Sequence, residues 1–195
     1  MTLFPGHPPD PANDEKGAHF NDDGSHRYRC WRTWDPAKPL IAVVGLNPSF
    51  ADAKKLDPTL HRVRTFARDW GFGGFEMWNL WSLCSTDPVG LWAWMRERDQ
   101  EEHFEANVAA IFAELPRFRD VLCAWGDFSA CPAGMRVEAG RVAVVAAEAI
   151  REGGASLWCL GRTKSGQPIH PLARGKSRIP DSSPRLPFHP TGSTP

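Results

Sequence analysis

This 195-residue sequence has no net charge and no closely paired cysteines. Its 23 basic and 23 acidic side chains cancel, so no global field draws the molecule toward a polyanion, and any contact with nucleic acid must come from a local basic patch. The five cysteines form no C-x-x-C pair, and Cys123 and Cys159 lie within apolar runs. The cysteines therefore indicate small core residues in a reducing compartment instead of a disulfide framework or an iron–sulfur site.

Long apolar runs and paired histidines are missing too. No run approaches the roughly 18 residues that cross a bilayer, and residues 1–10 lack the basic and apolar regions of a signal peptide, which predicts a cytoplasmic protein with no membrane partner. Neither His61 nor His103 has a partner at metal-ligand spacing, so we expect no metal and no cofactor. Tyrosine occurs once against nine tryptophans, but aromatic rings fill cores before they stack on bases, so this excess alone decides nothing.

The sequence does contain enough apolar material, 42% of its residues, for one α/β domain between two loose ends. Residues 1–26 carry many Pro, Gly, Asp and Asn with little apolar periodicity, which predicts a flexible leader. Residues 174–195 are Pro-rich and basic, which predicts an extended C-terminal tail. The folded domain is therefore expected at 27–173.

Within that domain, short apolar runs alternate with helical patterns. Asp57-Pro58 and Asp87-Pro88 each combine an N-cap with proline at the first helical position. Strands separated by helices pair in parallel through right-handed crossovers, which predicts a three-layer α/β/α sandwich around a mainly parallel sheet of about four strands. We expect buried strands at 40–46, 75–81, 121–125 and 156–160, an edge strand at 28–34, and helices at about 58–70, 89–96, 100–115 and 137–152.

Ligands of such sheets bind outside the carboxyl ends of the strands, and unusual polar residues gather there in this sequence. In Gly45-Leu46-Asn47-Pro48-Ser49, glycine permits close approach, asparagine can donate and accept, and proline fixes the turn. Asn79 lies in an apolar run and needs hydrogen-bond partners, and His170, between two prolines, can donate to a developing anion. The alternatives are a strand-ending turn, an asparagine that satisfies backbone groups and a solvent-exposed loop histidine.

Basic side chains lie close to two of these strand ends. They could form a phosphate-binding rim, although charges on surfaces are usually only solvated. The candidates for contact with a DNA backbone are Arg62 and Arg64 on the first helix and Arg162, Lys164 and Arg174 downstream.

Five motifs occur in order along the chain, and together they carry a resemblance. They are Gly45-Leu46-Asn47-Pro48-Ser49, Asp57-Pro58-Thr59, Trp78-Asn79-Leu80, Ala124-Trp125-Gly126 and Gly166-Gln167-Pro168-Ile169-His170-Pro171-Leu172. This set resembles an uncharacterised bacterial domain family over about residues 27–173. It is similar, more weakly, to the uracil-DNA glycosylase superfamily, especially its mismatch-specific and thymine-DNA glycosylase branch, which has Gly-x-Asn-Pro after the first core strand and a loop motif, often His-Pro-Ser-Pro, after the last.

The resemblance implies a uracil-DNA-glycosylase-like fold and a DNA glycosylase. Such an enzyme flips a modified or mismatched base out of duplex DNA, hydrolyses its N-glycosidic bond and leaves an abasic site, without an obligate protein partner; defence against phage DNA is one setting. Asn47 would hold the water and His170 would stabilise the departing base, while Asn79 would read the base and Asp52 could supply a carboxylate. The other expected pocket residues are Gly45, Leu46, Pro48 and Ser49, with Phe50 or Trp81 as the surface on which the base stacks.

Two departures from the glycosylase pattern leave other functions open. His170-Pro171 continues as Leu172-Ala173, without the serine that contacts DNA in the familiar loop, and Asn47 cannot act as a general base as aspartate does in the more active branches. A hydrolase or transferase that acts on free nucleotides would use the same pocket and fits the zero net charge better. A nucleic-acid-binding module without catalysis is the third possibility, in which Asn47 and His170 are structural.

Overall fold

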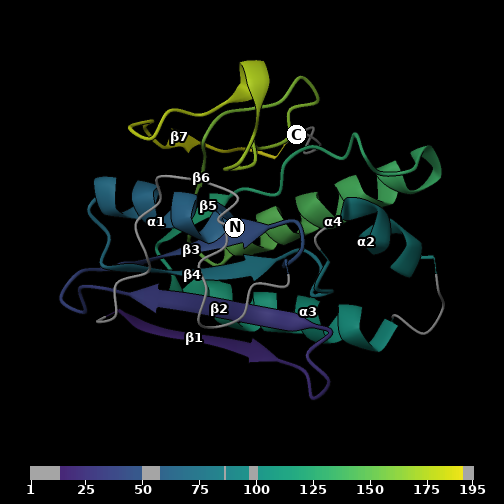
Figure 1. The fold of residues 1–195 in the computed structure, drawn as a ribbon, viewed down its shortest axis with the longest axis horizontal. Coiled ribbons are helices and arrows are strands. Elements are labelled where there is room, and N and C mark those ends of the chain that lie inside the picture. The colour runs from purple at the N-terminus through teal and green to yellow at the C-terminus, as the bar shows by residue number, and fades with distance from the viewer. Residues whose placement is uncertain (1–13, 50–57, 86, 97–100, 191–195) are drawn as a thin grey trace, which may run out of the picture.

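The computed structural model describes residues 14–49, 58–85, 87–96 and 101–190, which form an α/β domain around one mixed sheet (Figure 1). The sheet has seven strands in the order β1-β2-β4-β3-β5-β6-β7. The strands are β1 (Glu15–Phe20), β2 (Arg27–Thr33), β3 (Leu40–Gly45), β4 (Gly74–Asn79), β5 (Asp120–Cys123), β6 (Ser156–Cys159) and β7 (Leu186–Pro187). The helices are α1 (Pro58–Asp69), α2 (Pro88–Trp94), α3 (Glu101–Glu114) and α4 (Ala133–Glu152), with short 3₁₀ turns at Leu115–Arg117 and Gly175–Ser177.

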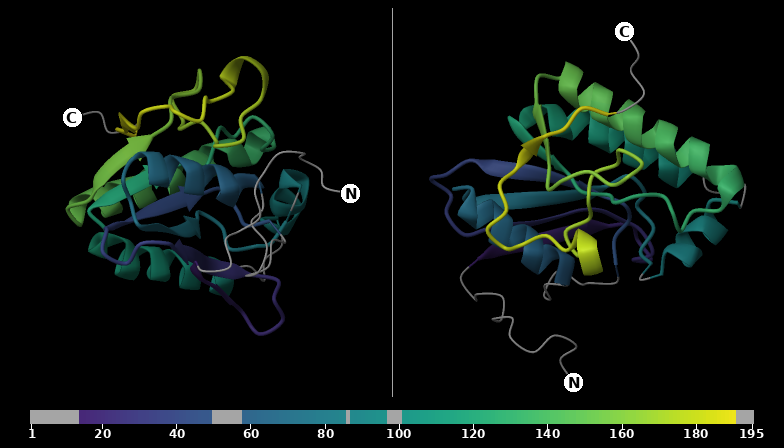
Figure 2. Two further views of the ribbon diagram at one scale, coloured as in Figure 1. Left: turned by 60° about the vertical axis from the view of Figure 1, so that its left-hand side comes forward. Right: turned by 90° about the horizontal axis from the view of Figure 1, so that it is seen from above.

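The four central strands, β4, β3, β5 and β6, are parallel, and they are the four buried strands that the apolar runs predict. Their side chains alternate between two cores. Ala42 and Val44 pack into one core with α2, α3 and α4, whereas Ile41 and Val43 pack into the other with α1. The view from above shows α1 and α4 on opposite sides of the sheet (Figure 2), so the three-layer arrangement is confirmed.

The predicted strand count was too low, because three antiparallel strands extend the parallel core. On one side, β1 pairs with β2 and β2 pairs with β4, so the predicted edge strand lies inside the sheet. On the other side, β7 pairs with β6. These pairings satisfy backbone groups that a bare parallel edge would leave open.

The expected leader and tail both contribute to the fold, which corrects the predicted domain limits. Strand β1 lies within the expected leader. In the tail, Ile179 and Phe188 are buried, and the indole nitrogen of Trp70 at the end of α1 donates to the Ser183 carbonyl at 3.0 Å. Two buried apolar side chains and a strand pairing fix an otherwise extended, Pro-rich segment to the domain.

The predicted helix start at Asp87-Pro88 agrees with the structure, and glycines with positive φ follow two of the helices. The Asp87 carboxylate caps α2 by accepting from the Val89 backbone N–H at 2.9 Å, Gly71 follows α1 with φ +85°, and Gly154 follows α4 with φ +94°. The predicted cap Asp57 lies outside the described residues. None of the helices in the described part of the chain is long and apolar enough to span a bilayer.

Candidate active site

The carboxyl ends of the four parallel strands meet at one edge of the sheet, as the sequence predicts. Gly45 at the end of β3 is the register partner of Asn79 at the end of β4. Side chains alternate between the two faces along each strand, so Gly45 and Asn79 lie on the same face as Val43, Phe75 and Met77. This is the face that α1 covers. The candidate site is therefore the α1 side of this edge.

Asn79 is the most unusual residue at this edge. Its side chain is 0% exposed, and within the described part of the chain neither Oδ1 nor Nδ2 has a hydrogen-bond partner. A Cβ on Gly45 would lie 2.7 Å from this Oδ1, so the side chain occupies space that only glycine leaves open. A buried amide without partners costs about 1–3 kcal/mol, which makes it a candidate for binding a ligand.

The backbone at Asn79 is fixed even though its side chain is unpaired. Asn107 of α3 donates from Nδ2 to the carbonyls of Asn79 and Leu80, both at 3.0 Å. The Leu80 N–H donates to the Gly45 carbonyl at 2.9 Å. Sequence reasoning missed Asn107, although a buried asparagine in an otherwise apolar helix pattern was a usable signal.

Asn47 has its amide nitrogen committed to backbone. Nδ2 lies 2.9 Å from the Ser85 carbonyl, 3.1 Å from that of Pro48 and 3.3 Å from that of Leu83. All three neighbours are carbonyl oxygens, so a flipped amide would place Oδ1 against other acceptors. The amide orientation is therefore settled. Asn47 therefore holds the chain that follows β4 against the end of β3, and its Oδ1 is left as the acceptor.

His170 lies over the end of β5. A Cβ on Gly126, which has φ +82°, would come within 3.3 Å of the His170 Cβ, so the histidine loop approaches the strand end closely. The Leu172 backbone N–H donates to His170 Nδ1 at 3.1 Å. Nδ1 is thus an acceptor, and the neutral ring carries its proton on Nε2, a tautomer that suits donation to an anion.

Two further contacts fix the histidine loop. The Trp125 indole nitrogen donates to Gln167 Oε1 at 2.9 Å, and Arg62 of α1 lies 3.4 Å from the Pro171 carbonyl through its Nε. The loop is thereby tied to β5 on one side and to α1 on the other. The motif containing Gln167 marked this loop, but nothing in the sequence indicated its indole partner.

The strand order sets the spacing of these groups. Asn79 ends β4, Gly45 ends the adjacent β3, and the contact between Gly126 and His170 lies at the end of β5, the next strand. Two interstrand spacings give about 10 Å, the scale of a nucleoside. The structure therefore brings Asn79, Asn47 and His170 to the same edge.

Three predicted roles need correction. Trp81 is 1% exposed and packs edge-on against Trp92 and Phe128 in the core on the opposite face, so its ring is no stacking surface. Arg64 donates twice to Asp14, at 3.0 and 2.7 Å. Arg62 donates to the Ile179 carbonyl and pairs with Asp181, and burial together with Arg178 lowers its pKa. Both arginines hold the fold together instead of facing a DNA backbone.

The other predicted residues divide into three groups. Pro48 is buried, whereas Leu46 and Ser49 are half-buried beside it. Phe50 and Asp52 lie outside the described residues. Lys164 and Arg174 are exposed, and Arg162 is exposed while it donates to the His189 carbonyl at 2.9 Å. Among the residues that the structure describes, no group of three or more His, Cys, Asp or Glu could hold a metal ion.

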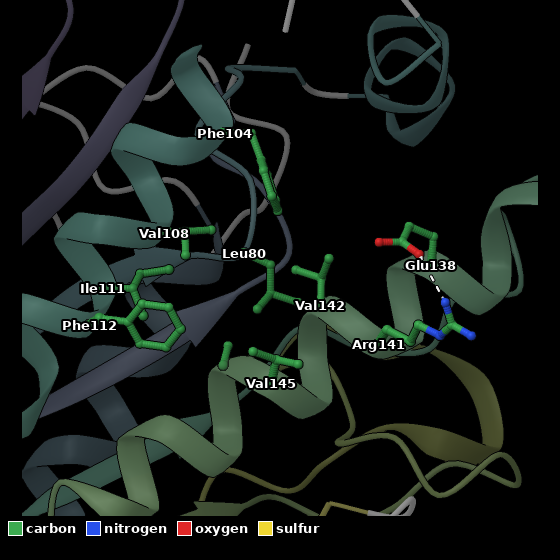
Figure 3. Close-up of a pocket in the computed structure, with 10 residues that line it drawn as sticks. Leu80, Phe104, Val108, Ile111, Phe112, Glu138, Arg141, Val142 and Val145 are labelled. Carbon is green, nitrogen blue, oxygen red and sulfur yellow. Dashed lines mark ion pairs between the residues drawn. The ribbon is translucent and has the colours of Figure 1, made fainter. Parts of the chain in front are cut away.

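An apolar groove lies between α3 and α4 (Figure 3). It has a volume of about 330 Å³ and lies on the face opposite the candidate site. Its only charged lining residues, Glu138 and Arg141, pair with each other at 3.9 Å. Apart from this ion pair, the lining residues are apolar.

Residues 27–172 match the family described as "Protein of unknown function (DUF1643)", and the chain belongs to that family. The matched range contains β2 to β6 and all four helices, and thus the whole candidate site, whereas β1 and β7 lie outside it. No curated protein and no solved structure matches the chain.

Proposed function

We propose that this protein is a DNA glycosylase that hydrolyses the N-glycosidic bond of a flipped-out base. The observation that carries the proposal is the fully buried Asn79 amide at the carboxyl edge of the sheet, whose Nδ2 and Oδ1 have no partner among the described residues. A nucleobase presents a complementary acceptor and donor side by side. An amide that is buried for packing alone would be expected to find partners in the protein.

The reaction divides naturally between the other two residues. Water attacks the sugar C1′, the C1′–N bond breaks, and its electron pair leaves with the base. His170 donates from Nε2–H to the base as negative charge develops on it, which stabilises the transition state more than the ground state. Asn47 accepts a hydrogen bond from the water through Oδ1, because its Nδ2 is held by backbone carbonyls. The water proton leaves to solvent, the departed base anion takes up a proton from solvent, and the products are a free base and an abasic site.

The resemblance to the mismatch-specific and thymine-DNA glycosylase branch supports this division of roles. Asn47 and His170 occur where that superfamily has its Gly-x-Asn-Pro and histidine-loop motifs, and the parallel α/β/α core is compatible with such a fold. The substrate we favour is a modified or mismatched base in duplex DNA, in repair or in defence against phage. All five cysteines are free and buried, which fits the reducing conditions of the cytoplasm.

A second candidate is an enzyme that cleaves free nucleosides or nucleotides. It is favoured by the internal pairing of Arg62 and Arg64, which removes two of the five predicted DNA contacts. The same strand-end residues and the same chemistry would serve a substrate without a long phosphate backbone.

Base release from matched substrates distinguishes the two. The protein is incubated with duplexes that contain uracil, mismatched thymine or phage-type modified bases, and in parallel with the corresponding nucleosides, and released bases are identified by mass spectrometry. Release from duplexes that is lost in an Asn79→Leu, His170→Gln double variant supports the glycosylase. Release from nucleosides alone supports the second candidate, and no release from either set contradicts both.

A further inference from the structure

The segment that contains and follows the candidate histidine is strongly basic. Residues 160–190 contain six lysines or arginines and a single acid, Asp181, although the whole chain has no net charge. The rest of the chain is therefore acidic overall. A surface of one sign on a neutral protein attracts a polyanion locally, and what it binds depends on how the fold presents these side chains.

One arginine closes part of this segment into a loop. Arg62 of α1 donates from NH2 to the Ile179 carbonyl, and its Nε lies 3.4 Å from the Pro171 carbonyl. Pro171 and Ile179 are both buried. A single guanidinium thus holds the two ends of residues 171–179 together, which is the geometry of a compact Ω-loop. We refer to residues 171–179 as the basic loop.

The backbone of the basic loop is well defined. Its first turn is shared with the candidate histidine, because the Ala173 N–H donates to the His170 carbonyl at 2.9 Å. A 3₁₀ turn at Gly175–Ser177 follows, and Gly175 has φ +60°, which glycine adopts without strain. The Arg178 N–H then donates to the Gly175 carbonyl at 3.1 Å. The side chains of the loop are therefore presented from a fixed backbone.

Three basic side chains of the loop are available to a partner. Arg174, Lys176 and Arg178 are all exposed, and none of them forms an ion pair with another residue that the structure describes. Asp181, the one acid of the segment, pairs with Arg62. Burial, and then the charge of Arg178, lower the pKa of Arg62, so Arg178 lies close to a second guanidinium. Like charges held together repel each other, and a bound anion would relieve this repulsion.

The basic loop lies beside the candidate active site. Helix α1 connects two parallel strands, β3 and β4, so its N-terminal half, which contains Arg62, is directed toward their carboxyl edge. The other end of the loop begins directly after His170. A partner bound to the loop is therefore adjacent to the candidate histidine.

We propose that the basic loop binds the phosphate backbone of DNA next to the nucleotide that enters the candidate active site, through Arg174, Lys176 and Arg178. The identity of the polyanion rests on the proposed function, because a chain of phosphates flanks a flipped base. Two guanidinium groups and an ammonium group suit phosphate oxygens as charge-assisted donors. Arg62 does not contact the DNA in this arrangement; it holds the loop that does.

Binding to an undamaged labelled duplex tests the loop without any base release. Arg174, Lys176 and Arg178 are changed together to glutamine in the full chain, and fluorescence anisotropy gives the affinity at several salt concentrations. The affinity at low salt is expected to fall about tenfold or more. The slope of log affinity against log salt is expected to decrease by about 0.9 for each phosphate contact that is lost.

The control removes the same charge from another part of the surface. Three exposed arginines outside residues 160–190 are changed to glutamine, namely Arg119, Arg141 and Arg151. The two triple variants have the same net charge, so a general electrostatic attraction weakens equally in both, and only a local contact separates them. The control is expected to keep the wild-type salt slope. Both variants are expected to keep the wild-type urea midpoint, since all six side chains are exposed.

Two results would overturn the loop as a DNA-binding surface. One is an equal loss of affinity in the two triple variants, and the other is poly-glutamate that displaces the labelled duplex as effectively as unlabelled duplex of the same charge. Failure of the glycosylase proposal is a different result. The Asn79→Leu, His170→Gln double variant is expected to bind the duplex as the wild type does, so binding that depends on the loop supports this inference even if no base is released.

Discussion

Two polar side chains at opposite ends of the parallel strands differ in whether they have hydrogen-bond partners. Where β5 begins, Asp120 accepts from the Trp158 indole nitrogen at 2.7 Å and from Arg185 at 2.8 Å, and the Arg185 guanidinium covers the Trp158 ring at 4.3 Å. Where β4 ends, Asn79 is more deeply buried and has no partner in the described part of the chain. Paired groups stabilise a fold, whereas a buried unpaired group is tolerated where it serves a ligand.

Replacement of Asn79 by leucine gives the largest effect that we expect. Base release falls about 10³-fold, because a pocket that recognises a base through hydrogen bonds loses both of them. The free energy of unfolding does not decrease, since the amide has no partner among the described residues and an apolar side chain of similar volume is easier to bury. Single-turnover base release and urea unfolding measure the two quantities on the same protein.

Asn79→Ser serves as a second variant if leucine proves too bulky beside Gly45. It keeps a small polar group and is expected to retain stability with a similar loss of activity. A loss of more than about 2 kcal/mol in both variants would mean that Asn79 is a structural residue like Asp120.

A second prediction concerns the effect of low pH on His26, which packs beside the segment that follows β4. His26 Nδ1 lies 2.9 Å from Ser82 Oγ, and its ring stacks on His103 at 4.0 Å. Burial first and His103 second lower the pKa of His26 to about 4, with Asp23 opposing them. His26 therefore binds a proton near pH 6.5 in the unfolded chain but only near pH 4 in the folded protein. The free energy of unfolding falls as the pH is lowered from 6.5 to 4.

The expected loss between pH 6.5 and 4 is about 3 kcal/mol. It is measured by urea unfolding at intervals of half a pH unit, above and below the window. His26→Gln should flatten the curve across this range. A wild-type stability that is constant from pH 6.5 to 4 would show that His26 titrates normally in the folded protein.

Asp120→Ala tests the paired end of the comparison. The change leaves the Trp158 indole N–H and the Arg185 guanidinium without their acceptor, and we expect unfolding to become easier by about 2 kcal/mol with base release unchanged. Glu138→Ala on α4 removes an exposed ion pair and is the matched control, expected within about 0.5 kcal/mol of the wild type. If Asp120→Ala lowered base release without lowering the free energy of unfolding, Asp120 would have a functional role and the contrast with Asn79 would be wrong.

The sequence predicted the parallel core well because its strands are short, largely apolar runs separated by helical patterns. Runs such as Leu40–Gly45 cannot be exposed, and the helices between them force parallel pairing. Strand β1, with the sequence EKGAHF, has no such signature and exists because β2 offers it a partner. Strand β7 has two residues and is fixed by long-range contacts that no local pattern encodes.

The position of the candidate site was predictable from the sequence, but the hydrogen-bond partners of its side chains were not. The strand-end rule placed Asn47, Asn79 and His170 at one edge, because parallel strands align their carboxyl ends. The rule could not tell that the Asn47 side-chain nitrogen would donate to backbone carbonyls, whereas the Asn79 side-chain amide would have no partner among the described residues. It also could not see that Arg62 and Arg64 would pair with Asp181 and Asp14, since ion pairs between distant segments leave no mark in either one.

The smallest expected effect decides whether the carboxyl edge faces DNA. Lys164 follows β6 and is exposed at this edge, whereas Lys38 precedes β3 at the opposite edge and pairs with Asp35 at 3.1 Å. If Lys164 contacts one phosphate, Lys164→Ala weakens duplex binding a few-fold and reduces the slope of log affinity against log salt by about 0.9, and Lys38→Ala changes neither. Fluorescence anisotropy with a labelled duplex at several salt concentrations measures both. Equal salt slopes in the two variants would show that Lys164 does not contact a phosphate of the duplex. Base release from nucleosides alone would then be the activity that we expect.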